Sequence, residues 1–321
     1  MEKTLNIVID TLGSDKGPEA IIEGARLVLE EHPEVNITLV GDKDFILSKG
    51  LNENRINIVH APETITNYDN AAEAFYKNPD VSVFKAVEEV NKDENAIGVI
   101  SVGNTGALMV ATIRYLLNEK RTRPALAAIL PNTQKSFTCL VDTGASIDCG
   151  PHQLVGFAHL GSDFMRDLYK IESPRVGLLS NGSEPTKGNK LVKETHKLLV
   201  VEPGINFIGN VEGNKALNGL CDVLVCDGFA GNQILKNTEG MAVNLITEII
   251  KYGKMSGNEA ITQQIAGYLM KTYDFESLGA GIMLGAKKLV LKCRGSSGPQ
   301  AIRNACNILI NLKNNKTVYE K

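Results

Sequence analysis

The sequence predicts an α/β fold in which a mostly parallel sheet is covered by helices on both faces. Short runs rich in β-branched residues alternate with longer stretches of helical periodicity, as in chains built from βαβ crossovers. The chain has 321 residues, of which 43% are hydrophobic and 22% charged, a balance typical of a globular protein with a large core. Glycine-rich polar loops follow most of the predicted strands.

Each predicted strand is a short apolar run that ends in small or polar residues. Strands are expected at 5–10, 37–41, 56–60, 97–101, 137–142, 175–180, 206–209, 222–227 and 288–293. Helices are expected at 18–31, 83–91, 106–117, 153–169, 189–199, 233–252, 259–272 and 299–312. Residues 95–113 carry no charge, but glycines in their middle predict a strand, a loop and a helix rather than a membrane span. We expect a single α/β unit over residues 1–321.

Composition excludes several classes of function. Lys plus Arg number 34 and Asp plus Glu 37, so the net charge is −3 and no nucleic-acid-binding surface is expected. The six cysteines form no C-x-x-C pair and the five histidines are scattered, so we expect buried free thiols, no metal and no cofactor. The apolar run at 5–10 is too short for a signal-peptide core, and a cytoplasmic protein is expected.

Seven loops that follow predicted strands are small, polar and rich in glycine. They occupy residues 11–18, 102–106, 143–146, 181–189, 209–213, 228–232 and 294–298. The carboxyl ends of parallel strands meet at one edge of a sheet, where open α/β sheets bind ligands. Most of the loops open a helix, whose free N–H groups favour anions, and three carry a cation: Lys16, Lys187 and Arg294. Each loop alone is typical of a tight turn, but the set predicts a cleft for phosphate or another small anion.

Several familiar catalytic motifs are absent from the sequence. It contains no G-x-x-x-x-G-K-[ST], no G-x-G-x-x-G after a strand and no G-x-S-x-G. A P-loop NTPase, an ordinary dinucleotide dehydrogenase and a hydrolase with a nucleophile elbow are therefore disfavoured.

Five segments, taken in order, resemble the PlsX phosphate acyltransferases of bacterial phospholipid synthesis. They read SVGNTGALM at 101–109, PRVGLL at 174–179, TKGN at 186–189, INFIGNVEG at 205–213 and CDGFAGN at 226–232. The resemblance runs from about residue 7 to residue 304 and implies a Rossmann-like three-layer α/β/α fold, similar to phosphotransacetylases and isopropylmalate dehydrogenases. It implies a homodimer that moves a fatty acyl group from acyl carrier protein to inorganic phosphate.

The resemblance also implies which residues carry the reaction. Lys187 is expected to neutralise charge on phosphate and in the transition state, and the Asn232 amide to donate to the thioester oxygen. Without the resemblance these two residues would be interpreted as a solvent-facing lysine and a helix cap. Contacts to phosphate or substrate are expected from other residues of the loops: Asp10, Gly13, Asp15, Lys16, Gly103, Asn104, Thr105, Gly106, Asp142, Asn189, Asp227, Gly228, Arg294, Ser296 and Ser297. Asp10 and Asp227 are expected to orient loops rather than to act as acid or base.

Some loops depart from the family pattern and keep alternatives open. Lys16 and Arg294 stand where the family has histidines, which preserves positive charge, whereas residues 72–80 lack the family's basic cluster. One alternative is an acyl phosphate-forming relative with another thioester donor, as in component C of glycine-type reductases. Another is a non-catalytic acyl-carrier-binding protein. A third is a decarboxylating dehydrogenase with Mg²⁺ at Asp10, Asp142 and Asp227.

Residues 233–272 predict a long helical hairpin with its turn at 251–257. The turn contains two lysines, a tyrosine and a methionine. Dimerisation and contact with the inner face of the membrane fit this segment equally well. Two lysines contribute only about 1 kcal/mol each near an anionic surface, so membrane contact would be weak.

Overall fold

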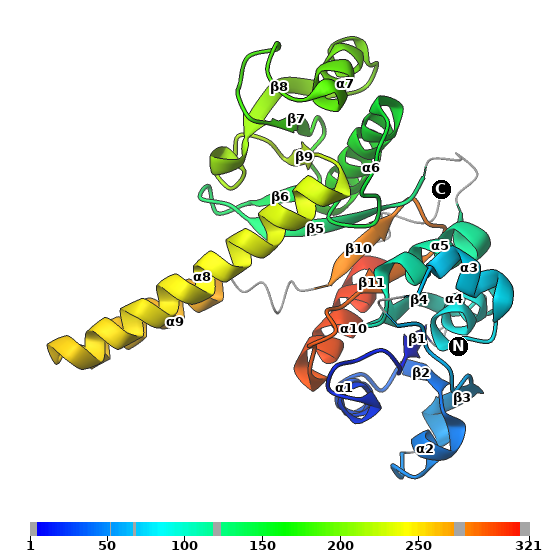
Figure 1. Ribbon diagram of the computed structural model, residues 1–321. Helices are drawn as coiled ribbons and strands as arrows, with labels where there is room; N and C mark the ends of the chain where they lie inside the picture. The colour runs from blue at the N-terminus through cyan, green and yellow to red at the C-terminus, as the bar shows by residue number, and fades with distance from the viewer. Residues whose placement is uncertain (1–4, 52, 67–68, 118–122, 273–279, 315–321) are drawn as a thin grey trace. The chain divides into compact units, whose positions relative to one another are not determined.

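The computed structural model of the protein describes residues 5–51, 53–66, 69–117, 123–272 and 280–314 (Figure 1). Its α/β fold with a mostly parallel sheet confirms the predicted fold class. The chain divides into two compact units. Unit 1 comprises Met1–Ala127, Asp163–Glu172 and Gly279–Lys321, and unit 2 comprises Ala128–Ser162 and Ser173–Leu278.

The sheet of unit 1 has the strand order β3-β2-β1-β4-β11-β10-β5. Its strands are β1 (Leu5–Asp10), β2 (Val35–Gly41), β3 (Ile56–His60), β4 (Ala96–Ser101), β10 (Gly281–Leu284), β11 (Leu289–Lys292) and the first half of β5 (Ala125–Pro131). Neighbours from β3 to β11 are parallel, and β10 is antiparallel to β11 and β5. The carboxyl ends of β1, β4 and β11 therefore lie side by side at one edge.

Helices cover both faces of this sheet (Figure 1). On one face α1 (Pro18–Glu31) packs against α10 (Pro299–Asn314), and each begins with proline, whose fixed φ suits the first helical position. The two helices approach each other closely at Gly24. A Cβ atom added there would lie only 2.6 Å from Ile302 Cβ. The other face carries α4 (Ser82–Lys92) and α5 (Thr105–Leu116). Two shorter helices, α2 (Lys43–Leu47) and α3 (Ala71–Lys77), were not predicted.

Unit 2 contains four parallel strands among its described residues, in the order β6-β9-β7-β8. They are β6 (Phe137–Val141), β7 (Arg175–Ser180), β8 (Asn206–Glu212) and β9 (Val223–Val225). Helix α7 (Lys190–Val201) packs on β7 and β8, and α6 (Pro151–Tyr169) begins in this unit. The carboxyl ends of β6, β9 and β7 are neighbours, as those of β1, β4 and β11 are in unit 1.

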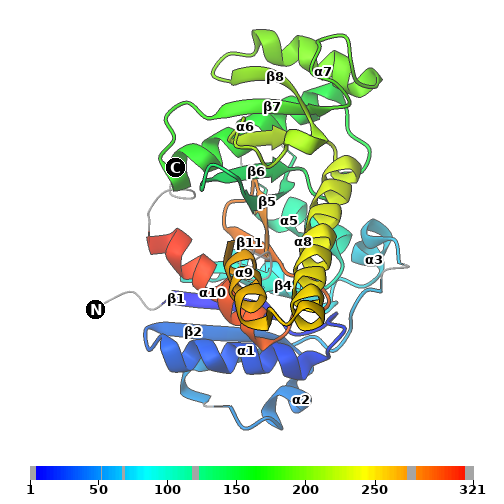
Figure 2. The ribbon, with the colours of Figure 1, turned by 90° about the vertical axis from the view of Figure 1, so that its left-hand side faces the viewer.

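The predicted hairpin consists of α8 (Gly228–Ser256) and α9 (Glu259–Thr272), which run side by side in both views (Figures 1 and 2). The start of α8 packs on the core of unit 2 through Ala230, Ile234 and Leu235. Helix α8 continues to Ser256 and ends at Gly257 in the left-handed conformation, so the turn is shorter than the predicted 251–257. Within the described residues, no helix is both long and apolar enough to cross a membrane.

Two predicted loops are parts of regular elements instead. Residues 228–232 form the first turn of α8, because Asp227 caps the helix immediately after β9. Residues 209–212 continue β8, which passes through an irregular register at Gly209, where φ is 99°. Strands β5 and β10 were missed: the sequence of β5, ALAAILP, is apolar throughout and has no period-2 pattern to mark a strand.

Candidate active site

Asp10 lies at the end of β1, fully inside unit 1. Its carboxylate accepts hydrogen bonds from Ser101 Oγ at 2.8 Å and from the backbone N–H of Leu12 at 3.2 Å. Burial disfavours the charged form and raises the pKa of Asp10 to about 6, although these hydrogen bonds oppose the shift. The carboxylate therefore orients the loop after β1, as expected from the sequence.

The first and last loops of the chain are joined in unit 1. The backbone N–H of Asp15 donates to the carbonyl oxygen of Gly295 at 2.9 Å, and Ser14 Oγ donates to the same oxygen at 3.3 Å. The exposed side chain of Lys16 reaches the start of α10, since a Cβ on Gly298 would lie 3.3 Å from Lys16 Nζ. Lys16 and Arg294, the two replacements of family histidines, thus lie on adjoining loops.

The loop after β4 touches the first loop through glycine. Gly13 has a φ of 83°, and a Cβ there would lie 2.7 Å from Gly103 Cα, so the two backbones meet where no side chain fits. Asn104 caps α5 by accepting from the N–H of Ala107 at 2.9 Å. Unit 1 therefore brings together the predicted residues of three loops: Asp10, Gly13, Asp15, Lys16, Gly103, Asn104, Thr105, Gly106, Arg294, Ser296 and Ser297.

Sequence reasoning missed Lys292, the last residue of β11. Its side chain lies next to two of these loops, those after β4 and β11, because its ammonium donates to the carbonyl oxygens of Val102 and Cys293. The signal that could have revealed it is a lysine closing an otherwise apolar strand, LVLK, immediately before a glycine-rich loop.

In unit 2, Asp142 organises the loop after β6. Its carboxylate accepts from the backbone N–H groups of Gly144, Ala145 and Ser146, the last at 2.6 Å. The first turn of α8 packs directly on this loop: a Cβ on Gly228 would lie 2.8 Å from Asp142 Oδ2. Asp142 thus shapes a backbone loop.

Asn232 lies in the first turn of α8 and faces the same loop, since a Cβ on Gly144 would lie 3.7 Å from Asn232 Cγ. It is not the helix cap: Asp227 has that role and accepts from the N–H of Ala230 at 2.7 Å. The Asn232 amide has no hydrogen-bond partner within the described part of the chain. A half-buried amide of this kind can donate to a ligand oxygen.

Lys187 is exposed on the loop between β7 and α7. The loop is held by the N–H of Gly188, which donates to Asn181 Oδ1 at 2.8 Å, and by Asn189, which caps α7 through the N–H of Val192. Among the described residues no carboxylate pairs with Lys187. Its positive charge is therefore available to an anion.

The predicted residues divide between the two units. Lys16 and Arg294 belong to unit 1, whereas Lys187 and Asn232 belong to unit 2. Lys187 lies on the loop after β7, and Asn232 lies in the first turn of α8, which follows the neighbouring strand β9. Asp10 likewise belongs to unit 1, and Asp142 and Asp227 to unit 2. The described residues contain no cluster of three His, Cys, Asp or Glu side chains suited to a metal ion.

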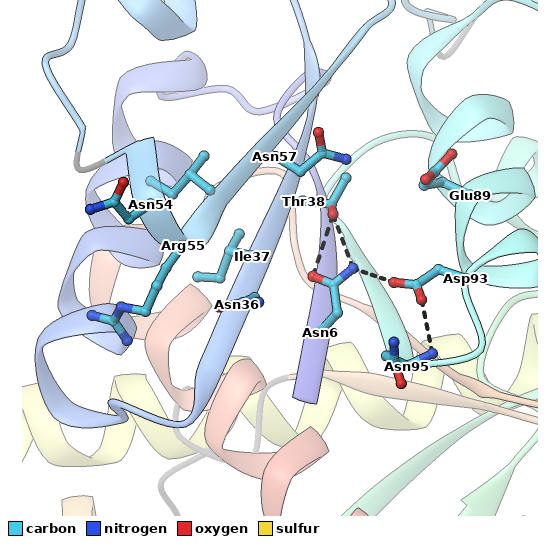
Figure 3. Close-up of a pocket in the computed structure, with 11 residues that line it drawn as sticks. Asn6, Asn36, Ile37, Thr38, Asn54, Arg55, Asn57, Glu89, Asp93 and Asn95 are labelled. Carbon is cyan, nitrogen blue, oxygen red and sulfur yellow. Dashed lines mark hydrogen bonds between the residues drawn. The ribbon is translucent and has the colours of Figure 1, made fainter. Parts of the chain in front are cut away.

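A hollow of about 430 Å³ lies in unit 1 at the amino ends of β1, β2 and β3, the end opposite to the loops (Figure 3). Its polar side chains bind one another: Asn6 donates to Thr38 Oγ1 at 3.0 Å and to Asp93 Oδ2 at 2.6 Å. Arg55 is occupied by backbone carbonyl groups. We therefore place the candidate active site at the carboxyl ends of the strands instead.

Comparison with known proteins finds relatives along nearly the whole chain. A family model described as "Fatty acid synthesis protein" matches residues 5–319. A phosphate acyltransferase of a Nitratiruptor species is 39% identical over 310 residues, which cover 94% of this chain and 92% of the relative. A phosphate acyltransferase of Clostridium acetobutylicum is 36% identical over 321 residues, which cover 97% and 96% of the two chains.

Solved structures share the fold at low sequence identity. A phosphotransacetylase from Streptococcus pyogenes has a TM-score of 0.62 at 15% identity and covers 98% of this chain and 94% of its own. A branched-chain phosphotransacylase from Enterococcus faecalis has a TM-score of 0.58 at 15% identity, with 96% and 99% covered. They confirm the predicted relation to the phosphotransacetylase fold. From the family model and the sequence relatives, the chain belongs to the fatty acid synthesis protein family, the PlsX family that its loop motifs indicated.

Proposed function

We propose that this chain transfers a fatty acyl group from acyl carrier protein to inorganic phosphate and so forms acyl phosphate for phospholipid synthesis. The observation that carries the proposal is its family membership over residues 5–319. The loops of unit 1 support it, because they hold Lys16 and Arg294 beside the start of α10, where phosphate would meet two cations and the positive end of the helix dipole.

The reaction needs no protein nucleophile. A phosphate oxygen attacks the thioester carbonyl carbon and forms the acyl–phosphate C–O bond, which gives a tetrahedral oxyanion. The oxyanion then collapses, the C–S bond breaks, and the carrier leaves as a thiolate. A thiol of pKa about 8.5 is a good leaving group, so the absence of both family histidines is tolerable. Catalysis then depends on positioning phosphate against the carbonyl and on donors aimed at the oxyanion.

Each proposed role matches the chemistry of a described side chain. Arg294 and Lys16 hold phosphate, Lys187 neutralises the charge that develops in the transition state, and the Asn232 amide donates to the thioester oxygen. Lys187 and Asn232 fit these roles because neither is committed to another described residue.

The proposal is tested by incubating the purified protein with acyl carrier protein loaded with a fatty acyl group. We expect free thiol and acyl phosphate to appear in equal amounts, and only when inorganic phosphate is present. A protein that merely binds the carrier releases no thiol.

The role of Arg294 is tested by two substitutions. Arg294→Glu should raise the phosphate KM steeply, whereas Arg294→His should retain activity. An unchanged phosphate KM in Arg294→Glu would show that Arg294 does not contact phosphate.

The hairpin is proposed to form a homodimer. Exposed apolar side chains recur at helical spacing along both helices: Met241, Leu245 and Tyr252 on α8, and Ile261, Ile265 and Tyr268 on α9. The stripe extends well away from the turn, which favours a second copy of the chain over membrane contact at the tip alone. Leu245→Glu combined with Ile265→Glu should convert a dimer to a monomer in light scattering.

Membrane contact is tested separately at the turn. Met255 is 79% exposed, next to Lys254. Met255→Glu should leave the dimer intact. If wild-type protein sediments with anionic lipid vesicles and Met255→Glu does not, the tip of the hairpin binds membrane as well.

The dimer proposal has its own contradicting outcome. If the Leu245→Glu, Ile265→Glu protein is still a dimer in light scattering, the hairpin does not form the dimer interface.

A further inference from the structure

Lys292 completes a row of polar residues across three strands of unit 1. It lies opposite Ser101 in the parallel pairing of β11 with β4. Ser101 in turn donates to Asp10 at the end of β1. A carboxylate, a hydroxyl and an ammonium thus follow one another along the edge from which the three glycine-rich loops leave the sheet.

The ammonium of Lys292 joins two of these loops. Nζ donates to the carbonyl oxygen of Val102, at 3.2 Å, and to that of Cys293. Val102 immediately precedes Gly103 and Asn104, and Cys293 immediately precedes Arg294. One cation therefore bridges the loop that begins α5 and the loop that contains Arg294, beside the backbone hydrogen bond from the Cys293 N–H to the Ser101 carbonyl oxygen.

This cation is half-buried and has no ion pair among the described residues. No carboxylate of the described residues lies within salt-bridge distance of Nζ, and Asp10 and Asp15 act on it only from farther away. Burial accordingly lowers the pKa of Lys292. A desolvated charge that two carbonyl dipoles only partly compensate costs free energy, and an anion bound above it would recover that cost.

We infer that Lys292 is a positioning residue for phosphate: it holds the Val102–Asn104 and Cys293–Gly295 loops together and supplies positive potential beneath the bound anion. The inference rests on the proposed function and adds a cation that the loop motifs do not contain. Lys292 acts through the loops and through its field, whereas Arg294 and Lys16 are the proposed direct contacts.

The same strand offers a matched control. Lys288, just before β11, also sends its ammonium to two backbone carbonyls, those of Val90 at 2.8 Å and Asp93 at 2.6 Å. It lies at the opposite end of the strand from the loops. Lys288→Met therefore removes a comparable lysine and its stabilising contacts without touching the proposed phosphate site.

The experiment compares Lys292→Met, Lys292→Arg and Lys288→Met with the wild type. We expect Lys292→Met to raise the phosphate KM about tenfold or more while the acyl-donor KM stays nearly constant, because a charged hydrogen-bonding group is lost beneath one substrate only. Lys292→Arg retains the charge and should recover much of the phosphate affinity. Lys288→Met should lower thermal stability but leave the phosphate KM unchanged.

A second measurement separates this inference from the proposed function. Inorganic phosphate should raise the Tm of the wild type and of Lys288→Met much more than that of Lys292→Met, since a ligand that binds more weakly stabilises less at the same concentration. If that pattern appears without acyl phosphate formation, the inference stands and the proposed function fails. If acyl phosphate forms but Lys292→Met keeps the wild-type phosphate KM and the wild-type Tm shift, the inference is overturned and the function stands.

Discussion

At the level of single residues, the predicted site separates into side chains that hold the backbone and side chains that are left for a ligand. Asp142, Asp227 and Asn104 accept hydrogen bonds from nearby N–H groups and shape the loops that contain them. Lys187 and Asn232 have no such partner in the described part of the chain. Substitutions of the three residues that hold the backbone should therefore lower stability, whereas substitutions of Lys187 and Asn232 should lower the rate of the reaction.

Lys187 provides the direct test of this division. Lys187→Ala should lower kcat by about a hundredfold and leave the carrier KM nearly unchanged, because its interaction grows as charge develops in the transition state. Lys190→Ala is the control: Lys190 follows closely in the chain, its side chain is 89% exposed, and it pairs only loosely with Glu194. Steady-state kinetics that showed equal losses of kcat and of carrier affinity for Lys187→Ala would remove its catalytic role.

Asp10 should make stability depend on pH. Its pKa rises from 3.8 to about 6 in the fold, so the folded protein binds its proton more tightly than the unfolded chain does. The tighter proton binding adds to the free energy of unfolding. This stabilisation is fully present below pH 4 and is lost as pH rises through about 6, so the free energy of unfolding falls by about 3 kcal/mol at most. Asp10→Asn removes the titrating group.

Urea unfolding of wild type and Asp10→Asn at pH 4, 5, 6 and 7 measures this effect. The wild type should lose stability relative to the variant across this range. A difference between the two proteins that stays constant with pH would show that Asp10 titrates normally. In Lys292→Met the pKa of Asp10 should rise further, because the nearby ammonium favours the carboxylate.

At the level of elements, helix caps and glycines decide where the site residues lie. Helix α8 can begin directly after β9 because Gly228 and Gly231 let its first turn approach the Asp142 loop. A Cβ on Gly231 would overlap the carbonyl oxygen of Asp142. This close packing fixes Asn232, the next residue, beside Gly144.

Gly231→Ala should therefore destabilise unit 2 by about 1–3 kcal/mol and reduce activity, because the helix must move away from the loop. Gly240→Ala lies in the same helix, where an added Cβ meets nothing within 4 Å. There alanine should stabilise the protein by about 0.5–1 kcal/mol, since it restricts the unfolded chain and favours helix. Thermal unfolding that ranked the two variants equally would contradict this account of the packing.

At the level of the whole molecule, charge bears on the choice of acyl donor. The chain has a net charge of −3, and α3, in the segment where the resemblance implies a basic cluster, contains one lysine and one glutamate. Lys77 in that helix pairs with Glu73, and Lys85 pairs with Asp80 and Glu88. These lysines are thus largely neutralised as partners for an acidic carrier protein, whereas Lys254 on the hairpin has no described partner.

We expect acyl carrier protein to be used more weakly, and with less sensitivity to salt, than is usual in the family, and small thioesters to compete better. Docking between opposite charges weakens as salt screens them, and here little basic surface is available to be screened. Steady-state rates with carrier-linked and coenzyme A-linked acyl groups, each at low and high salt, measure the effect. A tight carrier preference that disappears at high salt would mean that the carrier uses another, basic surface.

Much of the candidate site could be predicted because its residues follow strands. Parallel strands end at one edge, so the loops after the identified strands were expected at the carboxyl edge of a sheet, where ligands bind. The strand order in the structure then made neighbours of the loops after β1, β4 and β11, and of those after β6, β9 and β7. Lys292 was missed because its role depends on Val102, which is remote in sequence. Asp142 and Asn232 also became distinguishable only in the structure, where Asp142 holds its loop by hydrogen bonds and the Asn232 amide has no partner among the described residues.

The sequence by itself determined the fold class, the family and most element bounds, several of them to the residue, such as Pro18–Glu31 and Arg175–Ser180. These depend on local periodicity, caps and motif order, which are written along the chain. Only the tertiary structure decided that β5 and β10 are strands, that β8 continues through Gly209, and that the chain divides into two compact units. The physical reason is that pairing between strands, close backbone approach and the burial of charge depend on residues far apart in sequence, which no local pattern records.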